Sequence, residues 1–297
     1  MNDRDRDHDH DHGHGDSHYT RLTVDVTDHV GHIRFSVPDE YNRLPPAFWT
    51  EFPEALRRLD ARGDVRALII SSTGKHFTAG MDIGVFTGRR DEAADRGRAG
   101  EAKRRDLARL QEAFSLVERV RMPVIAAVQG GCVGAGVDLA AACDMRYCTR
   151  DAFFCIQEIN IGMAADVGTL QRLPKLMPDG LMRELAYTGR RLPAAEARTA
   201  GLVNEVYDDP EAMLAGVRAI AESIATKSPL AIHSSKEIMN YARDHSVEDA
   251  LRYQTVWMGA VTQAGEMAAH FGARAEGREA AYDDLAPIPA AENATRA

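Results

Sequence analysis

The feature that most constrains this chain is an apolar run followed by a glycine-rich loop and an alanine-rich segment. The run is Pro123-Val-Ile-Ala-Ala-Val128, the loop is Gln129-Gly-Gly-Cys-Val-Gly-Ala-Gly-Val-Asp138, and Leu-Ala-Ala-Ala-Cys-Asp144 follows. This order predicts a strand, a loop and a helix, with free backbone N–H groups at the helix N-terminus. Such a site binds negative charge, either a phosphate or the oxygen of a developing enolate. Both nucleotide-binding motifs fit poorly, because the glycine spacing differs from G-x-G-x-x-G and no Gly-Lys-Ser/Thr follows.

A second loop of the same kind lies earlier in the chain. Ala67-Leu-Ile-Ile-Ser-Ser72 is typical of a short buried strand, and it runs into Gly74-Lys-His-Phe-Thr-Ala-Gly-Met-Asp82. Each of the two loops follows a strand, and each could present a backbone N–H group. We therefore expect the two loops to share one site.

Composition narrows the class of protein. The chain has 297 residues, 44% of them hydrophobic, which suits one large domain or two small ones. The net charge is −9 without a basic stripe, so nucleic acid is an unexpected partner. No apolar run is long enough to span a membrane. The N-terminus lacks the pattern of a signal or transit peptide and the C-terminus is not a peroxisomal address, so we expect a cytosolic protein.

The first 18 residues differ from the rest. They are a low-complexity sequence rich in Asp and His, which cannot form a core and predicts a disordered tail. The five histidines in it, at positions 8, 10, 12, 14 and 18, could chelate a divalent ion weakly. The four cysteines lack C-x-x-C spacing and sit among apolar residues, so buried thiols are the expectation: Cys132, Cys143, Cys148 and Cys155.

The periodicity of the hydrophobic residues predicts strands and helices in alternation, followed by a helical C-terminal part. A hairpin is expected over 22–35, and a helix from Asn42 to about Leu59. The charged residues 88–106 suggest a mobile segment over a site, before a helix over 106–120. Strands are expected at 145–148, 152–156 and 203–206. One helix is expected at 135–143 and another begins at Asp166. Further helices are expected near 180–188, 194–200, 210–226, 229–243 and 247–262, and the last one ends near Glu276. This pattern is typical of an α/β fold with a helical appendage.

Three carboxylates lie in apolar surroundings after the second loop. They are Asp138 in the alanine-rich helix, Glu158 at a strand end, and Asp166 after Gly-Met-Ala-Ala. Burial of a carboxylate raises its pKa, and a raised pKa suits a general acid or base at neutral pH. Each residue also has a structural interpretation when it is taken singly: Asp138 as a buried helix residue with a partner, and Asp166 as an N-cap.

The two loops resemble the signature loops of the enoyl-CoA hydratase/isomerase (crotonase) superfamily. The matching segments are His76-Phe-Thr-Ala-Gly-Met-Asp-Ile83 and Val128-Gln-Gly-Gly-Cys-Val-Gly-Ala-Gly-Val-Asp-Leu139, and the resemblance runs from about Tyr19 to Arg252. It implies a spiral of ββα turns and a helical C-terminal trimerisation region, with trimers often paired into hexamers. The implied domains are a tail at 1–18, a core at 19–205, a helical region at 206–277 and a tail at 278–297.

The resemblance also implies the parts of a site. The N–H groups of Met81 and Ala135 would form an oxyanion hole for the oxygen of a coenzyme A thioester. The flanking residues Ala79, Gly80, Asp82 and Gly134 would contact the substrate. Lys75 would bind coenzyme A, although a solvated surface lysine is the alternative.

The run from Glu158 to Pro174, which contains Asp166, is similar to the Δ3,5-Δ2,4-dienoyl-CoA isomerases, as are Gly-Val-Asp-Leu and Cys-Asp-Met-Arg-Tyr-Cys. This similarity implies an enzyme of fatty acid β-oxidation that moves the 3,5-double bonds of an acyl-CoA to 2,4-conjugation. Glu158 would take a proton from C2, Asp166 would deliver one to C6, and Asp138 would shape the pocket. No metal or redox cofactor is required.

Three alternatives remain open at this stage. Within the same fold, the chain could be an enoyl-CoA hydratase or another acyl-CoA isomerase. From a different class, it could be a non-catalytic binding protein, or a metal-handling protein that uses the histidine-rich tail.

Overall fold

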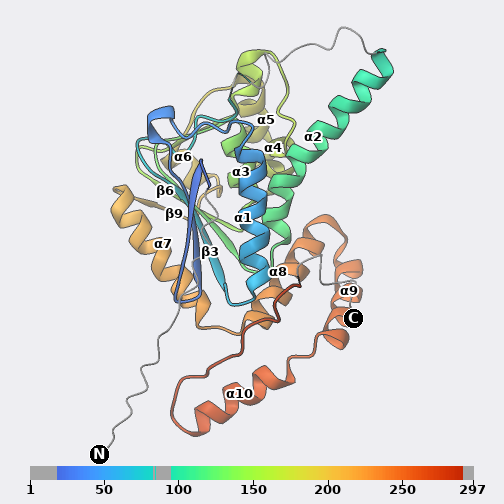
Figure 1. The fold of residues 1–297 in the computed structure, drawn as a ribbon. Helices are drawn as coiled ribbons and strands as arrows, with labels where there is room; N and C mark the ends of the chain where they lie inside the picture. Colours follow the sequence, from blue (N-terminus) through green and yellow to red (C-terminus); the bar gives the residue numbers. More distant parts are fainter. Residues whose placement is uncertain (1–18, 83, 85–94, 290–297) are drawn as a thin grey trace, which may run out of the picture.

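A six-stranded sheet forms the centre of the protein in the computed structural model, which describes residues 19–82, 84 and 95–289 (Figure 1). The strand order is β1 (Leu22–Thr27), β2 (Val30–Phe35), β3 (Ala67–Ser72), β4 (Val124–Val128), β6 (Met145–Thr149) and β9 (Glu205–Tyr207). Only β1 and β2 are antiparallel; each later pair is parallel. The expected α/β class and the hairpin are therefore confirmed.

Helices cover both faces of this sheet. Figure 1 shows α7 (Pro210–Ala225) on one face, and α1 (Phe48–Arg62), α2 (Arg96–Arg119) and α3 (Ala135–Ala142) on the other. One face of α1 is apolar and buried, with Phe48 and Phe52 stacked at 5.1 Å between ring centroids. Strands β3 and β4 are buried along their whole lengths, which is typical of parallel strands between two helical layers.

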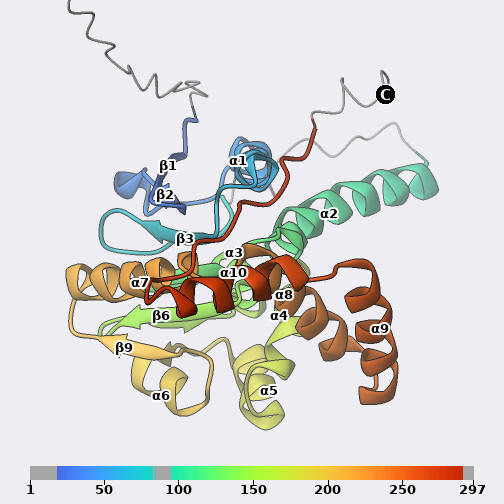
Figure 2. The ribbon, with the colours of Figure 1, turned by 90° about the horizontal axis from the view of Figure 1, so that it is seen from below.

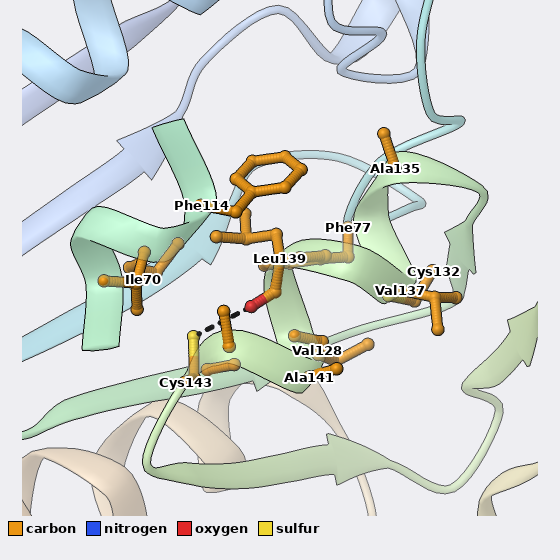
Figure 3. Packing of buried hydrophobic residues seen from close by; sticks show 14 of the residues in the cluster. Ile70, Phe77, Phe114, Val128, Cys132, Ala135, Val137, Leu139, Ala141 and Cys143 are labelled. Atoms are coloured by element: carbon orange, nitrogen blue, oxygen red, sulfur yellow. Dashed lines mark hydrogen bonds between the residues drawn. The ribbon is translucent and has the colours of Figure 1, made fainter. Parts of the chain in front are cut away.

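A second, three-stranded sheet lies beside the first and joins β5 (Gly131–Val133), β7 (Phe153–Cys155) and β8 (Leu192–Pro193). Helix α3 follows β5 in the chain. It is buried at every residue, because its many alanines let it pack closely inside the core. Figure 3 shows Val137 and Leu139 of this helix in the same apolar cluster as Phe77 and Phe114. The core thus fixes the segment that carries Ala135 and Asp138.

The remaining helices follow the expected order. They are α4 (Thr169–Arg172), α5 (Asp179–Thr188), α6 (Ala194–Thr199), α8 (Pro229–Asp244), α9 (Val247–Ala260) and α10 (Ala264–Ala275), with 3₁₀ turns at Pro38–Glu40, Glu158–Ile161 and Leu173–Lys175. Figure 2 shows α8 and α9 side by side at one end of the molecule.

Two helix starts differ from the sequence prediction. Helix α1 begins at Phe48 rather than near Asn42, because Tyr41 and Asn42 have φ angles of 52° and 51° and cannot begin a helix. Helix α2 begins at Arg96, not near 106, because the Asp95 carboxylate accepts a hydrogen bond from the Gly97 N–H and caps it. Residues 96–106 of the segment expected to be mobile are therefore helical, and 88–94 lies outside the described residues. Its mobility stays a prediction.

Two further boundaries shift. The helix expected from Asp166 starts at Thr169, with Gly168 as its N-cap at a φ of 135°, and β9 covers 205–207 rather than 203–206. The tail predicted for 1–18 lies outside the described residues.

Residues 278–289 contain neither helix nor strand, yet they are bound to the body of the protein. The N–H groups of Leu285 and Ile288 donate to Gly63 O and Ala61 O at the end of α1. The Arg66 guanidinium donates to Tyr282 O at 2.7 Å. This segment therefore ties the C-terminal region back to the sheet, and the proposed domain boundaries remain a prediction.

Candidate active site

Hydrogen bonds join the two glycine loops directly. They run from Phe77 N–H to Gln129 O, from Thr78 N–H to Gly131 O, and from Val133 N–H to Thr78 O, at 2.8 to 3.2 Å. The first loop also pairs with the chain before α1, since Leu44 N–H donates to Gly80 O and Asp82 N–H donates to Leu44 O. The parallel strands β3 and β4 end at the same edge of the sheet, and for this reason the two loops meet.

Two backbone N–H groups are left over at this junction. In the parallel bridge between Leu44 and Met81, the hydrogen bonds of Leu44 go to Gly80 O and come from the Asp82 N–H. The N–H of Met81, which lies between these two residues, therefore points away from Leu44. Ala135 is the first residue of α3, where an N–H has no partner inside the helix. Neither N–H has an acceptor among the described residues. Two such donors can stabilise an oxygen that gains negative charge.

Glycine is required where the loops approach. Gly80 has a φ of 88°, and a Cβ there would lie 2.7 Å from Val133 O and 3.6 Å from the nitrogen of Ala135. Gly134 has a φ of 52°, and a Cβ there would lie 3.1 Å from Glu158 Oε1. These positions place the end of the first loop, the start of α3 and the Glu158 carboxylate side by side.

Glu158 is held next to the second loop by its strand. The Gly134 N–H donates to Cys155 O at 2.9 Å, and Glu158 begins the 3₁₀ turn three residues later. Its Oε2 is buried and lacks a hydrogen-bond partner among the described residues. Burial, followed by the negative charge of Asp138, raises the pKa of Glu158 to about 7. A carboxyl group of this kind can both accept and donate a proton near neutral pH.

Asp138 is fully buried and its geometry is fixed. Its Oδ1 accepts a hydrogen bond from the Thr169 N–H at 2.5 Å, so that α3 caps the N-terminus of α4. Its Oδ2 has no partner among the described residues. Burial raises the pKa of Asp138 to about 6, against the opposing effect of the Thr169 hydrogen bonds.

Asp166 lies in the connection that leads to α4. Its backbone oxygen accepts a hydrogen bond from the Gln111 side chain of α2 at 2.7 Å. Burial raises the pKa of its half-buried carboxyl, while the charge of Lys103 opposes the shift. The charge of Asp166 in turn raises the pKa values of Asp138 and Glu158, so the three carboxylates act on one another.

The other predicted residues lie around the first loop. Lys75 and Ala79 are exposed, and the Ala79 N–H donates to Tyr41 O. Asp82 is half-buried, accepts from the Gly84 N–H at 2.8 Å and lies 3.3 Å from the Arg43 guanidinium. These contacts give Asp82 a role in the loop's own turn.

Two residues that build the site were not predicted from the sequence. The buried Asn42 amide donates to Thr73 O and His76 O, and its Oδ1 accepts from the Val37 N–H. It therefore supports the first loop from outside, and the available signal was an asparagine three residues before Pro45-Pro46. His76 accepts a hydrogen bond from the Gly131 N–H of the second loop. It belongs to the 76–83 segment that resembles the family, but its position there predicted no role.

The chain belongs to the enoyl-CoA hydratase/isomerase family, whose model matches residues 25–284. It is 41% identical over 271 residues to the mitochondrial Δ(3,5)-Δ(2,4)-dienoyl-CoA isomerase of Homo sapiens, and the alignment covers 89% of this chain and 82% of the relative. It is 42% identical over 235 residues to the peroxisomal isomerase of that name from Arabidopsis thaliana. This alignment covers 78% of this chain and 84% of the relative. An enoyl-CoA hydratase structure from Bacillus anthracis aligns with a TM-score of 0.80 at 28% identity. The alignment covers 88% of this chain and 98% of the hydratase chain. The crotonase-like fold is therefore confirmed.

The same comparison corrects one expectation. We expected a cytosolic protein because no targeting pattern was found, but the relatives are named as mitochondrial and peroxisomal proteins, which contradicts that assignment. Within the described residues, no helix has the length and apolar character needed to cross a membrane.

Proposed function

We propose that this protein is a Δ3,5-Δ2,4-dienoyl-CoA isomerase. The observation that carries the proposal is the grouping of three interacting carboxylates beside two unpaired backbone N–H groups. The relatives that bear this name support it. Glu158, with a pKa of about 7, can change its protonation state during the reaction. The proposal requires no metal or redox cofactor.

The reaction removes a proton from C2 and adds one at C6. When the C2–H bond breaks, its electron pair delocalises over the two double bonds and the thioester oxygen as a dienolate. The N–H groups of Met81 and Ala135 stabilise this oxygen; loss of one such donor typically lowers the rate by about 10²–10³. Protonation at C6 then leaves double bonds at C2 and C4.

The positions of the acids suggest the order of the two transfers. Glu158 Oε1 lies beside Gly134, next to the Ala135 N–H that would hold the thioester oxygen, and C2 is one bond from the thioester carbon. We therefore assign Glu158, as the carboxylate, to accept the proton from C2, and Asp166, as the carboxylic acid, to give a proton to C6. Asp138, whose Oδ1 is bound to Thr169, shapes the pocket and raises the pKa of Glu158.

Substitution of Asp166 by Asn tests this assignment. We expect formation of the conjugated 2,4-diene, followed by its absorbance, to fall by about 10³ or more, because proton delivery to C6 is lost. In D₂O the same variant should still exchange hydrogen at C2, since Glu158 remains. Glu158→Gln should lose both exchange and isomerisation. Binding of the CoA ester should persist in both variants.

Three outcomes would contradict the proposal in different ways. Unchanged turnover in Asp166→Asn would exclude its role. Loss of C2 exchange in Asp166→Asn, but not in Glu158→Gln, would reverse the two roles. Efficient addition of water to crotonyl-CoA without isomerisation would favour the hydratase alternative.

We also propose that the chain assembles into homotrimers or hexamers through its C-terminal helices. Large apolar side chains are exposed on α9 and α10 of the single chain, including Val247, Val256 and Phe271. Ala273 is the one buried residue of α10. An apolar helix surface of this kind marks an interface.

A further inference from the structure

His76 lies in the first loop, and its side chain reaches the second. The Gly131 N–H donates to His76 Nδ1 at 2.8 Å. This side-chain bond runs beside the three main-chain bonds that join the loops. Four residues after Gly131 comes Ala135, whose N–H belongs to the proposed oxyanion hole. His76 thus contributes directly to the spacing of the two loops.

The neighbours of the ring fix its place. A Cβ at Gly130, where φ is 55°, would lie 2.8 Å from His76 Nδ1 and 2.1 Å from Lys75 O, so this close approach requires glycine. The ring meets Phe153 edge-on at 6.3 Å and Tyr41 at 5.6 Å between centroids. The imidazole therefore has a defined position between the two loops.

The hydrogen bond also fixes the charge state of the ring. Nδ1 can accept from an N–H only when it carries no proton, so the imidazole is neutral and its proton is on Nε2. Burial lowers the pKa of His76 below its usual value, as do the positive charges of Lys75 and of Arg191, which lies over the Phe153 ring. The Asp151 carboxylate opposes this shift.

We propose that His76 is a positioning residue for the isomerase reaction, holding the second loop through the Gly131 N–H so that the Ala135 N–H meets the thioester oxygen. The role in catalysis rests on the proposed function; the contact between the loops does not. Protonation of Nδ1 places two donors against each other, which breaks the contact and misplaces the Ala135 N–H.

The consequence is a second acid limb in the pH dependence of kcat/KM, which reports the free enzyme. Loss of the Glu158 carboxylate below about pH 7 gives a limb of slope one. His76 titrates below the usual 6.5, and its protonation steepens the slope toward two at lower pH. Glu158 and His76 are then both responsible for the loss of activity in acid. Asp138, with a pKa of about 6, titrates in the same range but transfers no proton in the proposed reaction.

The experiment compares His76→Asn and His76→Leu with the wild-type protein. Asn keeps an acceptor oxygen close to the place of Nδ1 but does not titrate, so its activity at pH 7.5 should stay within about threefold and its acid slope should stay at one. Leu has no acceptor, and its kcat should fall about tenfold, less than the loss of a whole oxyanion donor. Hydrogen exchange over residues 129–133, measured without substrate, should be faster in the Leu variant only.

His29→Asn is the matched control. His29 lies in the β1–β2 turn, at the opposite end of β3 from the loops, and its φ of 64° suits asparagine. This variant should keep the steep acid limb. A wild-type slope of one throughout, or a His76→Leu protein with wild-type kcat and exchange, would overturn the inference. A wild-type protein without isomerase activity would overturn the proposed function instead, while hydrogen exchange still tests the contact.

Discussion

Glu158 combines a catalytic use with a cost in stability. Its pKa is about 7 in the folded protein against an ordinary value of 4.5, so between these two pH values the folded state binds more protons than the unfolded state. Stability therefore falls as the pH rises through this range, and the cost is fully present above pH 7. At the pH where it acts as a base, the carboxylate destabilises the fold that holds it.

We predict that Glu158→Gln is inactive but more stable than the wild type at pH 8, by about 1–3 kcal/mol, because the amide carries no charge. At pH 4.5 and below, the two proteins should unfold at the same temperature. Thermal unfolding at fixed protein concentration measures both values. Glu54→Gln, at an exposed position on α1, is the control for loss of a glutamate charge. Equal stabilities of Glu158→Gln and wild type at pH 8 would show that the Glu158 pKa is not raised.

At the scale of elements, the site depends on loop conformations that only glycine adopts. Gly134 has a φ of 52° and a ψ of −120°, and a methyl group there would contact Glu158 Oε1. We predict that Gly134→Ala lowers kcat by about 10²–10³, because the Ala135 N–H and the Glu158 carboxylate are both displaced. The backbone strain should also cost about 1–3 kcal/mol of unfolding free energy.

Gly100→Ala is the matched control for this change. Gly100 lies inside α2, and apart from the backbone of its own helix no heavy atom of the described residues lies within 4 Å of the added Cβ. Alanine there should stabilise the protein by about 0.5–1 kcal/mol and leave kcat unchanged. Wild-type kcat in Gly134→Ala would mean that the second loop tolerates a different backbone.

Patterns within one segment predicted much of this arrangement. The strand, glycine loop and helix around 123–144 could be read from order and spacing, because local propensity and burial agree there. The site roles of Glu158 and Asp166 came from the family resemblance, and the helix expected from Asp166 begins only at Thr169. The hydrogen bond from the Thr169 N–H to Asp138 could not, since it joins residues 31 apart and appears only when α3 and α4 pack together. The early start of α2 was missed because its first turns are exposed and carry no apolar periodicity.

At the scale of the whole molecule, the C-terminal region has two kinds of contact. Residues 278–289 return to the body, where Arg66 and Arg121 donate to the backbone oxygens of Tyr282 and Ala286. Helix α10, in contrast, buries little of its own surface, and Figure 1 shows it apart from the layers around the sheet. Helix α10, with 12 residues, is too short to be stable in water without tertiary packing, so another copy of the chain is the expected partner.

We predict that the protein has a solution mass of three or six times the 32.6 kDa of one chain, measured by light scattering after size exclusion. Met267 and Phe271 lie four residues apart on α10 and are 56% and 62% exposed in the single chain. Replacing both by Glu places charges on the apolar face, and we expect the mass to fall toward that of one chain. The control is Ala195→Glu at an exposed position on α6, which should keep the wild-type mass. A wild-type protein with the mass of one chain, or a double variant that still assembles fully, would show that α10 is not the interface.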